Sequence, residues 1–189
     1  KYDNVAKHIH LPAQSGSTRI LEKMNRTYTR EWYEERINRI KELMPECSIS
    51  SDIITGFCSE TEEDHQATLS LMKWAEYEFS YMYFYSERPG TLAARKYEDD
   101  VPEEVKRRRL TEVIEIQHEV AKRKNKAQEG KVHRVLIESK SKKNPDEWMG
   151  RNEQNIKVIF PKEHYKKGEY VNVRIERTTI TSLIGVAVS

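Results

Sequence analysis

Cysteine and long apolar runs are both scarce in this sequence. Its 189 residues include 2 cysteines, Cys47 and Cys58, and their spacing matches no zinc or cluster motif. Two thiols without a disulfide framework are typical of a reducing compartment, which predicts a cytoplasmic protein. No apolar stretch approaches the roughly 20 residues that cross a bilayer. The sequence has neither an initiator Met nor a basic-then-apolar leader, so we interpret it as part of a longer protein.

Charge is plentiful and unevenly distributed. The whole chain carries a net charge of +2. Residues 1–121 hold 17 Lys and Arg against 23 Asp and Glu, a net −6, whereas residues 122–189 hold 16 against 8, a net +8. This asymmetry predicts two modules, the second of which suits a polyanion.

The first half of the sequence alternates between strand and helix patterns. The expected order is strand, two helices, strand, helix and strand, over residues 7–13, 17–24, 29–44, 47–55, 61–75 and 79–85. One apolar stripe of the second helix contains Tyr33, Ile37, Ile40 and Met44,. Thr61 and Asp64 have the spacing of a capping box. This order favours a parallel β/α sheet or barrel.

The hydrophobic pattern changes in the second half of the sequence. A long helix is expected from Pro102 to a stop at Gly130,. Short alternating strands follow, separated by three expected turns at 144–146, 149–151 and 166–168. Such a pattern over about 60 residues indicates a small closed β-barrel. We therefore expect an α/β domain over residues 1–125 and an all-β domain over residues 126–189.

Three unusual turns lie where the expected parallel strands end. They are 14–17 with Gln14 and Ser15, 52–57 with Gly56, and 85–91 with Arg88. Sites in β/α barrels form at these carboxyl ends. The alternatives are a helix cap, an ordinary glycine turn, and a surface ion pair of Arg88 with Glu87 or Asp99. His8 and His10 have no third ligand nearby in sequence, so a core or surface role is favoured over a metal site.

Taken together, the three segments resemble a known family. HLPAQSGSTRILEKMNRTYT (10–29), SDIITGFCSETEEDH (51–65) and YSERPGT (85–91) resemble the radical S-adenosylmethionine (SAM) methylthiotransferases in the same order. Residues 126–189, with Gly150-Arg151 and Asn155, are similar to the small RNA-binding TRAM barrel of those enzymes. The resemblance implies the C-terminal half of a partial radical SAM β/α barrel followed by a TRAM domain.

The resemblance also implies cofactors and site residues. The full-length enzyme would use 4Fe-4S clusters and S-adenosylmethionine. The CxxxCxxC loop that binds the SAM-cleaving cluster is absent from these residues, so no cofactor is expected on this part alone, nor any catalytic or metal-binding residue. Gln14 and Ser15 would lie near the ribose or methionine of SAM, and the backbone from Ile54 to Gly56 along the adenine. Tyr85 and Arg88 would lie at the barrel mouth.

Two branches of the family differ in substrate. One modifies an adenosine next to the tRNA anticodon and the other an aspartate of a ribosomal protein. A net charge of +8 in the tail favours RNA, because phosphate neutralisation dominates its binding,. HRVLIE, SKSKKN and GRNEQN most resemble the enzymes that add a methylthio group to C2 of N(6)-isopentenyladenosine. Enzymes acting on threonylcarbamoyladenosine, on the ribosomal protein, or a non-catalytic RNA-binding module remain alternatives.

The expected partners follow from that assignment. They are tRNA, and a sulfur donor and an electron donor for the full-length enzyme. Lys142, Lys143 and Arg151 are the expected phosphate contacts, since flexible lysine stems can reach a backbone without a fixed register. The alternative is that this lysine-rich loop is simply solvated.

Overall fold

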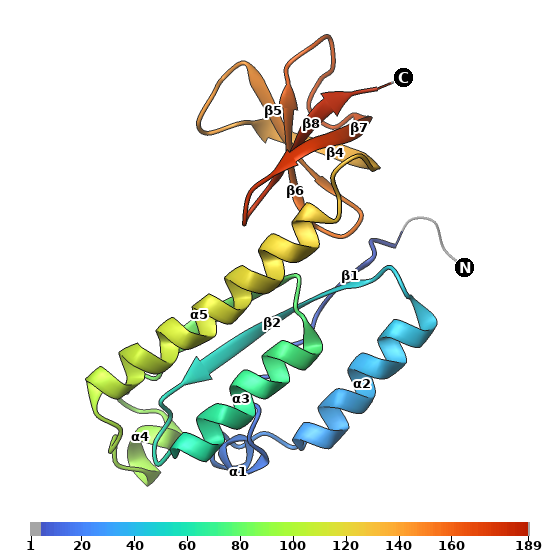
Figure 1. The fold of residues 1–189 in the computed structure, drawn as a ribbon. Coiled ribbons are helices and arrows are strands. Elements are labelled where there is room, and N and C mark those ends of the chain that lie inside the picture. The colour runs from blue at the N-terminus through green and yellow to red at the C-terminus, as the bar shows by residue number, and fades with distance from the viewer. Residues whose placement is uncertain (1–4, 189) are drawn as a thin grey trace. The chain divides into compact units, whose positions relative to one another are not determined.

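The computed structural model describes residues 5–188, which divide into two compact units (Figure 1). The β/α unit contains residues 9–45 and 49–120. The barrel unit contains residues 121–188 together with 5–8 and 46–48. The domain division expected at residues 125 and 126 stays a prediction.

A small sheet lies at the centre of the β/α unit. Its strands β1 (His8–His10), β2 (Ser48–Thr55) and β3 (Phe79–Phe84) are ordered β1-β2-β3. β2 and β3 are parallel, with Asp52 opposite Tyr81 and Thr55 opposite Phe84. Parallel strands need a crossover between them, and α3 (Glu62–Ala75) provides it. The predicted β/α order is therefore confirmed.

The helices begin where their capping residues predict. α1 (Thr18–Lys23) and α2 (Arg30–Leu43) start after Ser17 and Thr29, whose side chains accept backbone N–H groups. Thr61 and Asp64 form the expected capping box of α3. α4 (Leu92–Lys96) was not predicted and buries no residue, whereas α5 (Glu103–Lys126) follows Pro102 as expected. No helix within residues 5–188 is long and apolar enough to span a membrane.

One core joins the helices to one face of the sheet. Ile49 and Ile53 of β2 are buried in this core. Ile54, the next residue of β2, points to the opposite face of the sheet because side chains alternate along a strand,. Tyr33 and Ile37 of α2 are almost fully buried, as the stripe predicted. Met44 is not: it follows the last helical residue and is 36% exposed. The prediction for Met44 was wrong because Pro45 forces the residue before it out of helical geometry.

The barrel unit contains five strands in a closed order. They are β4 (Val132–Lys140), β5 (Glu147–Asn152), β6 (Lys157–Pro161), β7 (Tyr170–Thr178) and β8 (Leu183–Ala187), arranged β4-β5-β6-β8-β7. Alternate residues point inward and build the second core: Val135, Ile137, Trp148, Val158, Phe160, Val171, Val173, Ile175 and Leu183. The predicted fold class, an α/β part followed by a small β-barrel, is confirmed.

The turn expected at residues 149–151 was wrong. Met149, Gly150 and Arg151 lie inside β5, with Gly150 paired to Ile137 of β4 and Val158 of β6. A Cβ atom on Gly150 would lie 2.3 Å from the Leu136 carbonyl oxygen. Gly150 is therefore needed for the close approach of two strands. Gly150 predicted a turn because turns and closely paired strands both favour glycine.

Candidate functional site

The three unusual turns meet at one edge of the sheet. Gln14 forms a parallel bridge with Ile53, and its carbonyl accepts the Ile54 N–H at 2.8 Å. Gly56 follows the end of β2, and Tyr85 follows β3 with its N–H 2.8 Å from the Thr55 carbonyl. All three segments therefore leave the carboxyl ends of neighbouring parallel strands, where ligand sites form in such sheets. Four residues that were predicted to lie along S-adenosylmethionine are at this edge: Gln14, Ser15, Ile54 and Gly56.

The turn at residues 14–17 is held against α3. Gln14 has a left-handed φ of 67°. The buried Ser15 hydroxyl lies 3.3 Å from Thr68 Oγ1 and accepts the Ser17 N–H at 3.1 Å. A Cβ atom on Gly16 would lie 2.4 Å from the Ala67 carbonyl oxygen. The shape of this turn therefore depends on glycine and on Thr68, and Ser15 already has partners in the protein.

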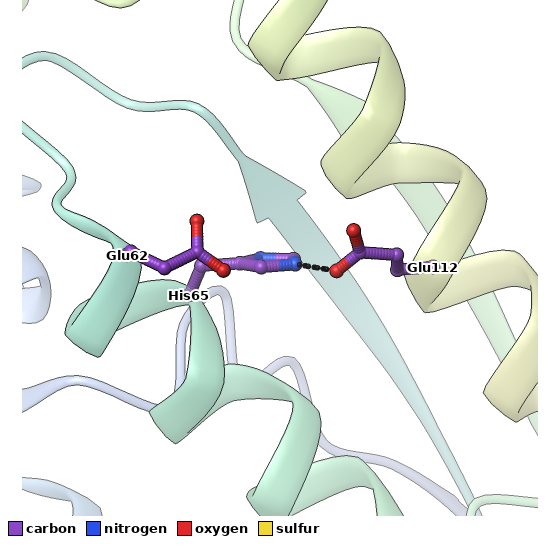
Figure 2. A group of neighbouring side chains, drawn as sticks. All are labelled: Glu62, His65 and Glu112. Carbon is purple, nitrogen blue, oxygen red and sulfur yellow. Dashed lines mark hydrogen bonds and ion pairs between the residues drawn. The ribbon is translucent and has the colours of Figure 1, made fainter.

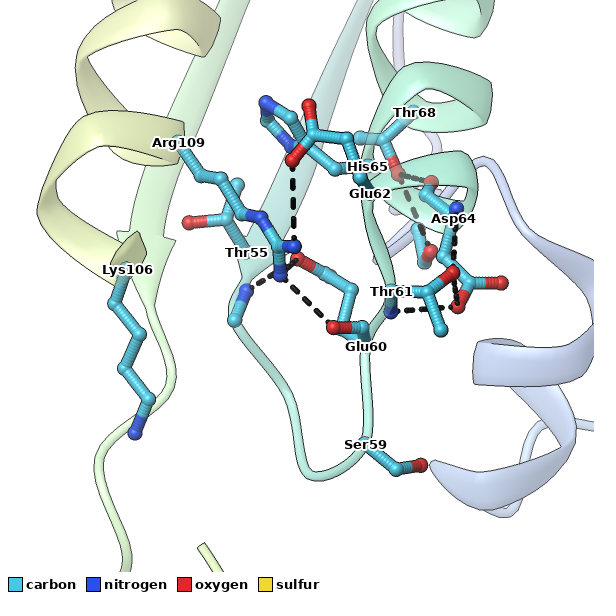
Figure 3. Close-up of polar contacts among 12 residues, drawn as sticks. Thr55, Ser59, Glu60, Thr61, Glu62, Asp64, His65, Thr68, Lys106 and Arg109 are labelled. Atoms are coloured by element: carbon cyan, nitrogen blue, oxygen red, sulfur yellow. Dashed lines mark hydrogen bonds and ion pairs between the residues drawn. The ribbon is translucent and has the colours of Figure 1, made fainter. Parts of the chain in front are cut away.

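Asp64 joins α1 to the start of α3. It accepts the Ser17 hydroxyl at 2.6 Å and the Arg19 guanidinium. It also accepts the Thr61 N–H at 2.9 Å (Figure 3). Burial by itself raises the pKa of Asp64, but the hydrogen bonds from Arg19, Ser17 and Thr61 outweigh it and hold that pKa well below its usual range. The sequence predicted only the capping role of Asp64. Its contacts across 45 residues carry no local signal.

Gly56 is packed against α5. It has a left-handed φ of 66°, and an added Cβ atom would lie 2.4 Å from Cγ of Lys106. The Lys106 side chain therefore occupies the position that a side chain at residue 56 would take. The Gly56 N–H donates to the Glu60 carboxylate at 2.8 Å. Glu60 also accepts Arg109 Nη1 at 2.9 Å, and both side chains are at least 95% buried (Figure 3).

This buried pair was missed because its partners are 49 residues apart. Burial raises the pKa of Glu60, and the Gly56 N–H and the Arg109 guanidinium act against that rise. A second group on α5, Lys106, pairs with Asp99. Asp99 lies in the segment between α4 and α5, and the Glu60–Arg109 pair attaches α5 to the loop that follows β2.

Tyr85 and Arg88 occupy different environments. Tyr85 is half-buried, with its ring 4.8 Å from that of Phe57, and burial raises its pKa to about 12. Arg88 is exposed, and its guanidinium forms no hydrogen bond or ion pair within the described part of the chain. The ion pair with Glu87 or Asp99 that was considered for Arg88 is not formed, and Asp99 binds Lys106 instead.

The sheet face opposite the helices is polar and aromatic. His10 lies 2.9 Å from the Ser50 hydroxyl and 3.5 Å from Asp52, and its ring meets Tyr81 edge-on. His8 similarly contacts Ser48 at 2.7 Å. Neither histidine belongs to a group of side chains within residues 5–188 that could hold a metal. The sequence favoured a core or surface role for these histidines, and no local pattern indicated the contacts of His10 with Asp52 and Tyr81.

One group of described side chains has the spacing of a metal site. Ligand atoms of Glu62, His65 and Glu112 lie within 4.8 Å of one another, with His65 Nε2 2.8 Å from Glu112 (Figure 2). Arg108, however, binds Glu112 at 2.5 Å and Glu62 at 2.7 Å. A guanidinium that bridges both carboxylates supplies the positive charge that a cation would bring. We therefore interpret the group as an ionic link between α3 and α5.

The predicted RNA contacts lie on the barrel unit. Lys142 and Lys143 are exposed in the turn between β4 and β5, and no ion pair involves them within residues 5–188. Arg151 lies on β5, where it donates to the Asn155 carbonyl at 2.8 Å and pairs with Glu138 at 3.4 Å. Arg151 is therefore partly engaged within the protein, whereas the two lysines are not.

Family profiles and a solved structure match parts of this chain. The Radical SAM superfamily profile matches residues 1–72, and the TRAM domain profile matches residues 126–188. Coproporphyrinogen III oxidase from Escherichia coli, a radical SAM enzyme, has a similar fold, with a TM-score of 0.53 at 15% identity over 78% of this chain and 41% of that one. The fold thus defines part of a radical SAM domain together with a TRAM barrel.

Relatives of high identity narrow the family. Proteins named tRNA-2-methylthio-N(6)-dimethylallyladenosine synthase from Amoebophilus asiaticus, Flavobacterium johnsoniae and Bacteroides thetaiotaomicron are 58%, 54% and 50% identical over 97%, 100% and 96% of this chain. The chain spans about two fifths of their length, between 38% and 40%. Over nearly its whole length, the chain is therefore similar to part of these radical SAM methylthiotransferases.

Proposed function

We propose that this chain is the C-terminal part of a tRNA methylthiotransferase that adds a methylthio group to C2 of N(6)-isopentenyladenosine next to the anticodon. The observation that carries the proposal is the identity of 50–58% to relatives with a matching name, over nearly the whole chain. The edge formed by the turns at Gln14, Gly56 and Tyr85 agrees with it, because β/α barrels bind ligands at the carboxyl ends of their parallel strands,.

S-adenosylmethionine is the proposed ligand of this edge. We propose that Gln14 and Ser15 lie near its ribose or methionine and that the backbone from Ile54 to Gly56 lies along its adenine. Gln14 and Ser15 supply polar groups in a buried turn, and Ile54 is half-buried on the sheet face opposite the helices. Exposed Arg88, which keeps its guanidinium unpaired within residues 5–188, would meet the substrate's anionic backbone at the barrel mouth beside Tyr85.

The cysteines of this chain do not fit a 4Fe-4S cluster. Clusters of this type are held by several closely spaced thiolates. Cys58 is buried, and burial raises the pKa of its thiol, which keeps it protonated. Cys47 is 11 positions away and lies on a different segment. The clusters that the family uses would therefore be bound by other residues of the full-length enzyme, whose sulfur and electron donors are also proposed partners. The cytoplasmic location stays a prediction.

Methylthiolation by the full-length protein tests the proposal. The protein, reconstituted anaerobically with iron and sulfide, is incubated with S-adenosylmethionine, a reductant and tRNA carrying isopentenyladenosine. Mass spectrometry of the nucleosides should show the 2-methylthio product. A matched tRNA carrying threonylcarbamoyladenosine, and the ribosomal protein with the target aspartate, should give no product. Product from one of these substrates and not from the first would show that this other substrate is the enzyme's target.

RNA docking by the barrel unit makes a separate prediction. Replacing Lys142, Lys143 and Arg151 together with alanine should weaken tRNA binding and lower the slope of log affinity against log salt by roughly 0.7–0.9 per lost contact. The slope is measured on the 189-residue chain at several salt concentrations. A triple replacement of Lys41, Lys73 and Arg39 on α2 and α3 removes the same charge and should leave the slope unchanged. Equal effects of the two triple variants would contradict the assignment.

A further inference from the structure

One face of the barrel brings cationic and aromatic side chains into a continuous row. Tyr170 of β7 pairs with Leu136 of β4, Leu136 pairs with Arg151 of β5, and Arg151 pairs with Lys157 of β6. Directly paired residues present their side chains on the same face of a sheet. Because their neighbours Val135, Val171 and Val158 point into the core, this row lies on the outside of the barrel.

The row ends in a stacked pair. The Arg134 guanidinium lies over the Tyr170 ring, 4.1 Å from its centroid. Tyr170 is 56% exposed, Arg134 is also exposed, and no ion pair involves Arg134 within residues 5–188. An exposed aromatic ring normally has little to keep it in one orientation, whereas a guanidinium over its face restrains it. The pair therefore presents a flat, positively charged surface to the solvent.

Residues around the Arg134–Tyr170 pair add apolar and polar surface to it. Val132, which is 54% exposed, pairs with Arg174. This pair lies two residues along β4 from Arg134 and so faces the same side of the barrel,. Asn172, opposite Arg134, adds an exposed amide. Glu176, which also lies on β7, is 3.9 Å from Arg174 and pairs with it only weakly. The face thus combines one exposed ring, apolar area and the cation of Arg134, which has no ion pair within residues 5–188, whereas Arg151 and Arg174 are partly compensated by Glu138 and Glu176.

We propose that the outer face of β7 and β4, centred on Tyr170 and Arg134, binds an unpaired RNA base by extending their stack, while Arg174 and the row to Lys157 bind the flanking phosphates. The inference rests on the proposed function and locates base recognition on the barrel unit. Aromatic rings and guanidinium planes are the groups on which proteins stack unpaired bases. A duplex would satisfy the phosphate contacts only, because its bases already stack on one another.

The charge of this unit argues against an ordinary protein partner. Its residues 122–189 carry 16 Lys and Arg against 8 Asp and Glu. Charge-rich surfaces of one sign select partners of the other sign. A similar pair on α2, Trp32 beneath Arg36 at 5.1 Å, lies in the half of the chain whose net charge is negative. It serves as a matched control, since it has an exposed ring and a guanidinium without the basic surroundings.

Binding of the 189-residue chain to two RNAs tests the proposal. One is a hairpin with an unpaired loop, and the other a blunt duplex with the same number of nucleotides. Tyr170→Ala should weaken hairpin binding about 5- to 150-fold without changing the salt slope. Duplex binding should change by no more than about twofold. Tyr170→Phe should retain hairpin affinity, and Trp32→Ala should behave as the unmodified chain. Arg134→Ala should weaken the hairpin and also lower the salt slope by roughly 0.7–0.9.

Three outcomes overturn the inference. If Tyr170→Ala binds the hairpin as well as the unmodified chain does, the stack takes no part in binding. If it weakens hairpin and duplex equally, the effect is not on an unpaired base. Both results leave the RNA-docking role of the barrel intact. If the unmodified chain shows no salt-dependent binding to either RNA, the inference and that docking role fail together.

Discussion

Replacing Arg109 with methionine should lower the free energy of unfolding of the β/α unit by about 3–5 kcal/mol. The Arg109 side chain is 5% exposed and that of its partner Glu60 is 1% exposed. Removing the guanidinium leaves a carboxylate that water cannot reach, held by the Gly56 N–H alone. Urea unfolding followed by the helical circular dichroism signal measures the loss, because α1 to α4 and most of α5 belong to this unit.

Arg107→Met is the matched control for this variant. Arg107 lies on the same helix and pairs with Glu103, but both side chains are 67% exposed. An exposed pair of this kind contributes less than about 1 kcal/mol. The double variant Glu60→Gln with Arg109→Met should recover part of the loss, because no buried charge remains. If Arg109→Met and Arg107→Met are equally stable, the Glu60–Arg109 pair does not hold α5 to the site.

Asp64→Asn should destabilise the same unit by about 2–3 kcal/mol at neutral pH. The asparagine amide replaces an oxygen that accepts the Thr61 N–H and the Arg19 guanidinium with a group that only donates. The folded-state pKa of Asp64 lies below its unfolded value of about 3.9,. Its stabilising effect is therefore fully present above that pH and is lost as the pH falls toward the folded-state pKa.

The pH series distinguishes this role from a general packing defect. Stability of the unmodified chain should decline between about pH 5 and pH 2, and the Asp64→Asn variant should decline less over that range. Glu35→Gln provides the control, because Glu35 is 68% exposed and its ion pair within residues 5–188 is with its neighbour Arg36. A variant whose acid sensitivity equals that of the unmodified chain would show that Asp64 is not held ionised by its hydrogen bonds.

Most element boundaries were predictable because their causes are local. Thr29 and Thr61 cap helices through atoms within three residues, and Pro102 precedes α5. The errors have a common cause. Met44 and the segment at Gly150 were assigned from periodicity and glycine preference, but a following proline and a strand crossing decided their positions.

The sequence by itself determined the fold class, the charge asymmetry and the three turns whose motifs indicate the family. These depend on residue order, hydrophobic period and local backbone preference. Only the tertiary structure decided which side chains surround those turns. Thr68 beside Ser15, Lys106 against Gly56 and the Glu60–Arg109 pair all join residues more than 45 positions apart. Pairing over such distances is set by how the helices pack on the sheet, which no local pattern encodes. The Arg134–Tyr170 stack likewise follows from the register of β4 and β7.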